Sequence, residues 1–132
     1  MKVLVADDDD AIRKLVTRLF ERRGDTVENV SDGEEAIGRL SKETFDLLLL
    51  DLMMPRTDGL GVLAYLAERR AVSPKVIVMT AAIPSLAASV PRSQVLAVVT
   101  KPFELTNLLR IAEEAMTKVS GTVPPAPTAR PA

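Results

Sequence analysis

Leu47-Leu48-Leu49-Leu50-Asp51 lies near the middle of this 132-residue chain, four leucines that end directly in a carboxylate. A short, continuous apolar run of this kind is typical of a strand buried on both faces of a parallel sheet. Residues 26–30 alternate instead and include Glu28, which suits a strand at the edge of a sheet. Three further runs resemble the central one: residues 3–6, 76–79 and 95–99. We therefore expect five strands.

Helical patterns separate these strands. The first is an apolar stripe that we expect to face the core, made of Ile12, Leu15, Val16, Leu19 and Phe20. The second helix opens at residues 31–34, Ser-Asp-Gly-Glu, which have the spacing of a capping box. Apolar residues at helical spacing support further helices over residues 60–66 and 105–115. Strand and helix alternate along the chain, so the predicted class is α/β with a parallel sheet.

Two stretches are expected to be irregular. Pro84 and Pro91 leave room for at most about two helical turns between them, so the fourth helix is predicted to be short or irregular. From Ser120 onward, four of thirteen residues are proline and no apolar period remains. We expect one domain over residues 1–119 and a Pro/Ala-rich tail or linker, disordered, over residues 120–132.

Composition narrows the possible chemistry. The chain has 17 basic and 18 acidic residues and a net charge of −1, so no basic face for nucleic acid or anionic membrane is expected. It contains no Cys and no His, which excludes thiolate nucleophiles, most zinc sites and histidine acid–base catalysis. The N-terminal apolar run is too short for a signal peptide or a membrane span, so a cytoplasmic location is the default expectation.

Five polar residues follow or close the predicted strands: Asp7, Asp8, Asp51, Thr80 and Lys101. The carboxyl ends of parallel strands meet at one rim, which is where ligands bind in open α/β sheets. Three converging carboxylates repel one another unless a cation is present, and Mg²⁺ prefers such oxygen ligands. We expect Asp8 and Asp51 to bind the metal directly, and Asp7 directly or through water.

Asp9 and Asp10 continue the acidic run but are interpreted differently. Acidic residues favour the first turn of a helix, so one of the two is expected to cap the first helix. The rim residues instead suggest phosphoryl chemistry. A carboxylate at a buried strand end, such as Asp51, can act as a nucleophile and take up a phosphoryl group as an acyl phosphate. An ammonium such as Lys101 would compensate charge, and the Thr80 hydroxyl suits a phosphoryl oxygen.

Four motifs together resemble the receiver domain of two-component response regulators. They are Asp7-Asp8, the run from Asp51 to Gly59 (Asp-Leu-Met-Met-Pro-Arg-Thr-Asp-Gly), Met79-Thr80-Ala81 and Lys101-Pro102-Phe103. They occur in the family's order and spacing, and the resemblance spans roughly residues 1–118. It implies a flavodoxin-like, doubly wound sheet with strand order 2-1-3-4-5. It also implies a cis bond between Lys101 and Pro102.

The resemblance assigns a role to each rim residue. Asp51 is implied to be the phosphoacceptor, Thr80 the switch hydroxyl and Lys101 the residue that pairs with the phosphoryl group. Asp7, Asp8, Asp51 and the backbone carbonyl of Met53 are implied to bind Mg²⁺, or Mn²⁺ in its place. The donor would be a histidine kinase or a histidine phosphotransfer protein.

The same resemblance implies a consequence of phosphorylation. The domain would switch conformation to control an output domain or a downstream protein, as a monomer or a weak phosphorylation-dependent dimer. It would be a signalling phosphoacceptor that catalyses only its own phosphotransfer and slow self-dephosphorylation. The domain itself would contact neither nucleic acid nor membrane.

The chain departs from the family's pattern in its switch region. Receivers often carry an aromatic residue three positions before the lysine, where this chain has Val98. Met53 and Ala82 flank the approach of water to the acyl phosphate, and neither can orient that water by hydrogen bonding, which predicts slow self-dephosphorylation. The altered switch region keeps open the alternative of a pseudo-receiver, a phosphorylation-independent protein interaction module.

Two enzyme-like alternatives lack their signatures. A haloacid-dehalogenase-like phosphatase needs a second aspartate two residues after the nucleophile, where this chain has Met53. Gly33 and Gly38 have the spacing of the glycines in a phosphate-binding loop, but Arg39-Leu40 follow in place of the Lys-Ser/Thr pair.

Overall fold

The computed structural model describes residues 1–69, 73–81, 85 and 88–119. The expected tail from Ser120 lies outside the described residues, and so do residues 82–84 and 86–87 of the stretch in which the fourth helix was expected. The elements of the described part are β1 (Lys2–Ala6), α1 (Asp10–Arg22), β2 (Thr26–Val30), α2 (Gly33–Lys42), β3 (Leu47–Asp51), α3 (Gly59–Glu68), β4 (Lys75–Ala81), β5 (Ala97–Lys101) and α5 (Leu105–Val119).

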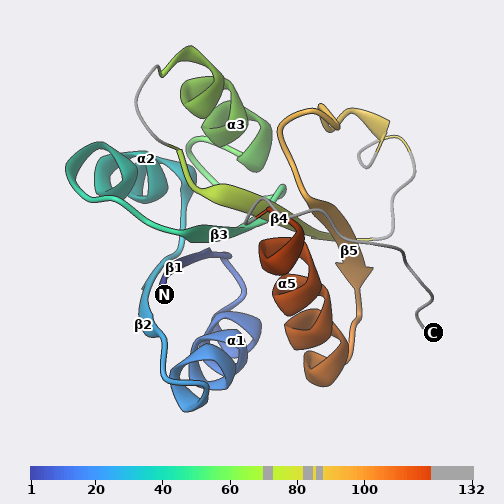
Figure 1. Cartoon of the computed structure of the whole chain (residues 1–132). Coiled ribbons are helices and arrows are strands. Elements are labelled where there is room, and N and C mark those ends of the chain that lie inside the picture. Colours follow the sequence, from blue (N-terminus) through green and yellow to red (C-terminus); the bar gives the residue numbers. More distant parts are fainter. Residues whose placement is uncertain (70–72, 82–84, 86–87, 120–132) are drawn as a thin grey trace.

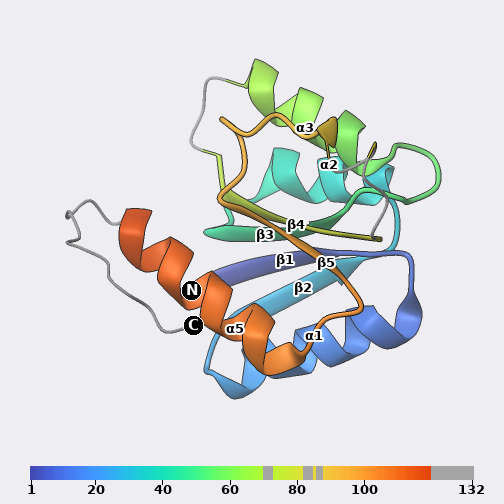
Figure 2. The same ribbon diagram turned by 90° about the vertical axis from the view of Figure 1, so that its right-hand side faces the viewer.

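All five strands form one parallel sheet in the order β2-β1-β3-β4-β5, which confirms the predicted topology. Helices α2 and α3 cover one face of the sheet, and α1 and α5 cover the other (Figures 1 and 2). The fifth strand begins at Ala97, two residues later than its apolar run predicts, and it includes Lys101 as its last residue.

The core is split by the sheet into two apolar layers. Side chains alternate across a strand, so Leu48 and Leu50 pack toward α2 and α3, whereas Leu47 and Leu49 pack toward α1 and α5. All four leucines have no exposed surface, as expected for a central strand covered on both faces. Burial of this run places Asp51 at the end of a rigid element.

Helix α1 is rotated relative to the stripe predicted for it. Val16 and Phe20 are fully buried, but Leu15, predicted to face the core, is 50% exposed. Thr17 is buried in its place, and its hydroxyl accepts a hydrogen bond from the side chain of Asn29 at the edge strand β2. The hydroxyl of Thr17 is tolerated in the interior because it is hydrogen-bonded.

Aspartates cap the first two helices. Asp9 accepts a hydrogen bond from the backbone N–H of Ile12, which confirms that one of the two later aspartates caps α1. At α2 the cap is Asp32, which accepts from the N–H of Glu35, so the capping box predicted from Ser31 was placed one residue too early. The side chain of Glu35 reaches back to the N–H of Ser31.

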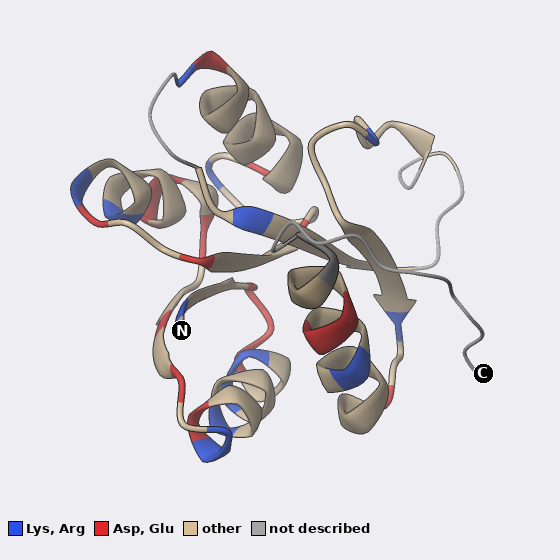
Figure 3. Ribbon diagram, viewed as in Figure 1, with Lys and Arg blue, Asp and Glu red and all other residues tan. Residues whose placement is uncertain are grey.

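Charges of both signs are distributed over the helices. Figure 3 shows basic and acidic residues together on α1 and on α5. Within the described part of the chain, no helix combines the length and the apolar character needed to cross a membrane.

Candidate functional site

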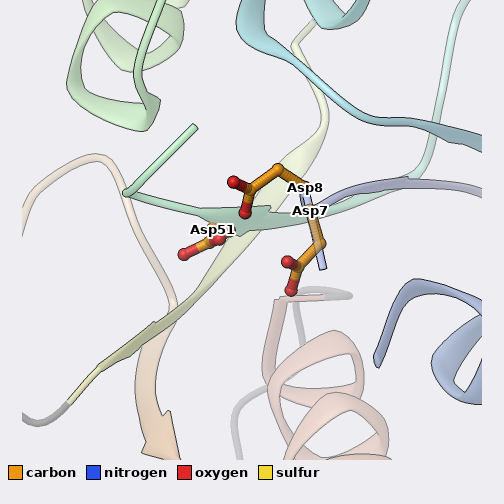
Figure 4. A group of neighbouring side chains, drawn as sticks. All are labelled: Asp7, Asp8 and Asp51. Atoms are coloured by element: carbon orange, nitrogen blue, oxygen red, sulfur yellow. The ribbon is translucent and has the colours of Figure 1, made fainter. Parts of the chain in front are cut away.

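The three predicted metal ligands come together at the carboxyl ends of β1 and β3. These strands are neighbours with Ala6 opposite Leu50, so Asp7 follows β1 next to Asp51 at the end of β3. One carboxylate oxygen from each of Asp7, Asp8 and Asp51 lies within 4.8 Å of the others (Figure 4). Asp7 and Asp51 are buried, whereas Asp8 is exposed. The cluster thus has two inner carboxylates and one at the solvent edge.

Asp7 is held on three sides. Its backbone N–H donates to the carbonyl of Val30 at 3.2 Å, and its Oδ1 accepts from the N–H of Asp9 at 2.9 Å. Its carbonyl oxygen accepts from Nη1 of Arg13 at 2.9 Å. The remaining oxygen, Oδ2, is buried and has no hydrogen-bond partner in the described residues, although Lys101 lies beside it. A buried carboxylate oxygen whose neighbour is an ammonium is in an environment suited to cations.

Lys101 supplies positive charge between the two buried carboxylates. Its Nζ lies 2.9 Å from Oδ2 of Asp7 and 3.4 Å from Oδ2 of Asp51. Burial disfavours the charged ammonium, but the interaction with Asp7, and then with Asp51, outweighs burial and raises the pKa of Lys101. The amine is therefore a fixed cation near neutral pH. The bond from Lys101 to Pro102 is cis, which confirms that prediction.

Asp51 titrates far from the usual range of an aspartate. Burial, and next the negative charge of Asp7, raise the pKa of Asp51 to about 7, against the opposing effects of the Met53 N–H and Lys101. The Met53 N–H donates to Oδ1 of Asp51 at 3.2 Å. Without further positive charge, this carboxyl group is only partly ionised at neutral pH.

Thr80 lies near the same end of the sheet as the carboxylates, on the neighbouring strand β4. On β4 it follows Met79, the residue paired with Asp51, and its side chain is fully buried. Its Oγ1 has no hydrogen-bond partner in the part of the chain that is described. A buried hydroxyl with no partner costs free energy, so a ligand oxygen that accepts from it would recover that cost.

The segment after Asp51 packs tightly against the rest of the fold. A Cβ on Gly33, at the start of α2, would lie 1.7 Å from the carbonyl oxygen of Thr57, and one on Gly59 would lie 2.5 Å from that of Asp51. Arg56 has a left-handed backbone with φ 69°, and its Nε lies 3.5 Å from Oδ2 of Asp32. Gly33 therefore serves close packing, in agreement with the rejection of a phosphate-binding loop.

The residues present fit a bound magnesium ion. Asp7, Asp8 and Asp51 offer carboxylate oxygens from two neighbouring strand ends, and one of them, the buried Oδ2 of Asp7, already lies 2.9 Å from the ammonium of Lys101. Oxygen donors of this type are what Mg²⁺ selects. Met53, whose carbonyl was the fourth predicted ligand, follows Asp51 by two residues and has a 51% exposed side chain.

Arg13 was not predicted from the sequence to be part of the site, although it donates a hydrogen bond to the carbonyl oxygen of Asp7. It lies on α1 among other basic residues, and no motif separates it from Lys14 or Arg18. Ala82, expected near the path of water to the acyl phosphate, lies outside the described residues. Val98, in the position of the usual aromatic residue, is partly buried and packs against the layer beneath α2 and α3.

Residues 3–113 match the family described as the response regulator receiver domain. The chain belongs to this family. The match covers the sheet except for its first residue, Lys2, and it covers more than half of α5, so the receiver assignment applies to nearly all of the described structure.

Known proteins similar to this receiver agree with the assignment. It is 40% identical over 80 residues to the transcriptional regulatory protein ResD of Bacillus subtilis, covering 61% of this chain and 32% of ResD. A CheY-like receiver domain protein from Methanospirillum hungatei has a similar structure, with a TM-score of 0.80, 25% identity and coverage of 89% of this chain and 94% of that one. The chain thus spans about a third of ResD, and its fold extends over nearly all of the solved chain from Methanospirillum hungatei.

The response regulator TrrA from Thermotoga maritima was solved in complex with Mg²⁺ and BeF. It has a TM-score of 0.76 and 25% identity to this receiver, and the likeness covers 86% of this chain and 97% of TrrA. Receiver domains are signalling modules, and this one carries an acidic pocket of the kind in which the family binds Mg²⁺.

Proposed function

We propose that this receiver accepts a phosphoryl group on Asp51 from a phosphohistidine of a histidine kinase or phosphotransfer protein. One observation carries the proposal: buried Asp51 lies beside a second buried carboxylate, Asp7, with the ammonium of Lys101 within 3.4 Å of both. Such a site brings together two carboxyl groups and only one ammonium, so it is adapted to a further cation and to a transferred anion together. The proposed donors place the domain in the cytoplasm.

Phosphoryl transfer at this site needs little covalent chemistry from the protein. The Asp51 carboxylate attacks phosphorus, an O–P bond forms and the N–P bond of the phosphohistidine breaks. The electron pair of that bond stays on the imidazole nitrogen, which later takes a proton from water. Asp51 must be ionised to attack, and its pKa of about 7 leaves a substantial fraction of it protonated at neutral pH in the absence of metal.

Asp7, Asp8, Asp51 and the carbonyl of Met53 are the proposed ligands of Mg²⁺, or of Mn²⁺. When bound, the ion supplies positive charge that favours ionised Asp51 and compensates the charge of the transferring group. Lys101 holds a further positive charge beside the accepting oxygen. The residues of the chain thus position the acceptor and stabilise charge.

Thr80 is proposed to report the modification. Its buried hydroxyl has no partner in the described residues, so it can donate to a phosphoryl oxygen once one is present on Asp51. A change of this hydrogen bond would alter the end of β4 and the segment after it. We propose that this alteration controls an output domain or a downstream protein, with the domain a monomer or a weak phosphorylation-dependent dimer.

The test is labelling with acetyl phosphate in the presence of Mg²⁺, with mass spectrometry of the intact protein as the readout. We expect the mass increment of one phosphoryl group, lost in Asp51→Asn and on removal of the metal by chelation. Glu21→Gln is the matched control, because Glu21 is an exposed carboxylate near the far end of α1 from the acidic cluster. No increment in the unmodified protein would favour the pseudo-receiver, a module that binds partners without phosphorylation.

A further inference from the structure

Arg13 is hydrogen-bonded to the peptide group that joins Asp7 to Asp8, between β1 and α1. Its Nη1 donates to the carbonyl oxygen of Asp7 at 2.9 Å, and its Nη2 forms an ion pair with Asp10. Only 14% of its side chain is exposed, although Arg13 lies on the first turn of a surface helix. The neighbouring basic residues Lys14 and Arg18 are exposed. Arg13 is thus directed toward the acidic cluster.

The contact acts on the orientation of Asp8. A peptide group is planar, so the carbonyl oxygen of Asp7 and the Cα of Asp8 lie in one rigid plane. The N–H of Asp7 donates to the carbonyl of Val30, and its Oδ1 accepts from the N–H of Asp9. The Asp7–Asp8 peptide group itself is held by the hydrogen bond from Arg13 to its carbonyl oxygen. Since the side chain of Asp8 is exposed, little packing restrains it, and the direction of its Cα–Cβ bond depends on this peptide.

The charge of Arg13 and its hydrogen bond have opposite effects on the affinity of the site for Mg²⁺. A guanidinium near a cation site weakens the binding of a second cation. Here, however, the carboxylate of Asp10 pairs with Arg13 and offsets much of that charge. The two effects predict opposite outcomes when Arg13 is replaced: loss of positioning loosens Mg²⁺ binding, whereas loss of charge alone tightens it.

We propose that Arg13 is a positioning residue of the metal site, which orients the Asp7–Asp8 peptide so that both carboxylates face the ion. This inference rests on the proposed function, because it assumes that the cluster binds Mg²⁺. Residues that support metal ligands from outside typically change metal affinity about 10- to 100-fold when they are lost. For a backbone contact we expect the lower end, about tenfold.

The test is calorimetric titration of the unphosphorylated domain with Mg²⁺. Arg13→Met keeps an apolar stem and removes the donor, and we expect it to weaken Mg²⁺ binding about tenfold. Arg13→Lys keeps a cationic donor on a long side chain and should recover part of the loss. Arg18→Met removes the same charge from an exposed position of α1 and is the matched control, expected to leave the affinity within about twofold of the unmodified domain.

A second readout separates positioning from general damage. In acetyl phosphate labelling, Arg13→Met should shift the half-saturating Mg²⁺ concentration upward by the same factor, with the maximal labelling rate unchanged. Should Arg13→Met fail to fold in circular dichroism, Arg13→Gln replaces it, since glutamine suits a helix but is too short to reach the Asp7 carbonyl. We expect the same loss of affinity for it.

The outcomes distinguish the two proposals. Unchanged or tighter Mg²⁺ binding in the folded Arg13 variants overturns the positioning role and leaves the phosphoacceptor function in place. An equal loss in Arg18→Met also overturns it, because the effect would then come from charge or from the helix in general. Absence of any Mg²⁺ binding to the unmodified domain overturns both proposals.

Discussion

The two halves of the strand-end rim differ in how their polar atoms are held. At β1 and β3, the carboxylates of Asp7 and Asp51 have hydrogen bonds from backbone N–H groups and share the ammonium of Lys101. At β4, the buried hydroxyl of Thr80 has no partner in the described residues. The half proposed to do chemistry is therefore assembled in advance. The half proposed to sense the product has, among the described residues, a hydroxyl without a partner, which a new group can satisfy.

Asp51→Asn should produce the largest effect on stability, and it probes the assembled half. In the metal-free protein the pKa of Asp51 is raised to about 7, above the value near 3.9 expected in the unfolded chain. The folded state therefore keeps its proton longer, and stability falls as pH rises from about 4 to 7. Asparagine does not ionise, so Asp51→Asn does not lose stability in this way as the pH rises.

Without metal, we expect the free energy of unfolding of Asp51→Asn to be higher than that of the unmodified protein by up to about 4 kcal/mol at pH 8. At pH 4 the two free energies should differ little. Urea denaturation at both pH values, in the presence of a chelator, measures the difference. A gap that does not grow with pH would show that Asp51 is not strained by its neighbours, and the contrast between the two halves would weaken.

Lys101→Met tests whether the ammonium serves transfer more than metal binding. We expect the labelling rate to fall about 100-fold, the usual cost of removing one charge-stabilising donor. Mg²⁺ should bind more tightly, because a competing cation 2.9 Å from Asp7 is gone. Calorimetry and labelling measured on the same protein separate the two quantities.

Lys75→Met is the control for Lys101→Met, since Lys75 is exposed at the opposite end of β4. Weaker Mg²⁺ binding in Lys101→Met would contradict the expectation. It would mean that the lysine holds the carboxylates in place instead of competing with the ion.

Met53→Asn tests the lifetime of the acyl phosphate. The half-exposed Met53 side chain lies two residues after Asp51 and cannot orient water, so we expect slow self-dephosphorylation in the unmodified protein. An asparagine can hydrogen-bond water there and should speed decay by about tenfold, less than the usual contribution of general acid–base catalysis. Decay of the phosphorylated mass after removal of acetyl phosphate gives both rates. Fast decay in the unmodified protein would refute the argument.

Thr80→Val is expected to have the smallest effect on stability and probes the sensing half. Valine has the shape of threonine without the unpartnered hydroxyl, so the unphosphorylated protein should be unchanged or more stable by about 1 kcal/mol. Labelling at Asp51 should persist, while phosphorylation should no longer alter hydrogen exchange in β4. Retention of that alteration would show that another group senses the phosphoryl.

Thr17→Val is the matched comparison for Thr80→Val. Thr17 is also buried, but its hydroxyl accepts a hydrogen bond from Asn29. Valine there leaves the donor without its partner and should cost about 1 kcal/mol. Opposite signs at the two threonines would sharpen the distinction between a satisfied and an unsatisfied buried hydroxyl.

Local patterns were sufficient to predict most of the architecture. The run Leu47–Leu50 indicates a strand buried on both faces, and the carboxyl ends of parallel strands share one edge, so Asp51 and Asp7 were expected to meet. The order of the strands came from the family resemblance and is confirmed. The exposure of Leu15 was not predicted, because helical spacing gives a stripe but not its exact rotation against a sheet.

The sequence alone determined that three carboxylates, a hydroxyl and an amine lie at the strand ends. Their convergence at one rim could be predicted as well, because parallel strands place their carboxyl ends at the same edge of a sheet. Tertiary structure decided which of these groups are buried and what they touch. Asp7 is enclosed while the adjacent Asp8 is exposed, and Arg13 reaches the peptide between them. Burial and charge act through space between elements distant along the chain, so the raised pKa of Asp51 follows only from the folded arrangement.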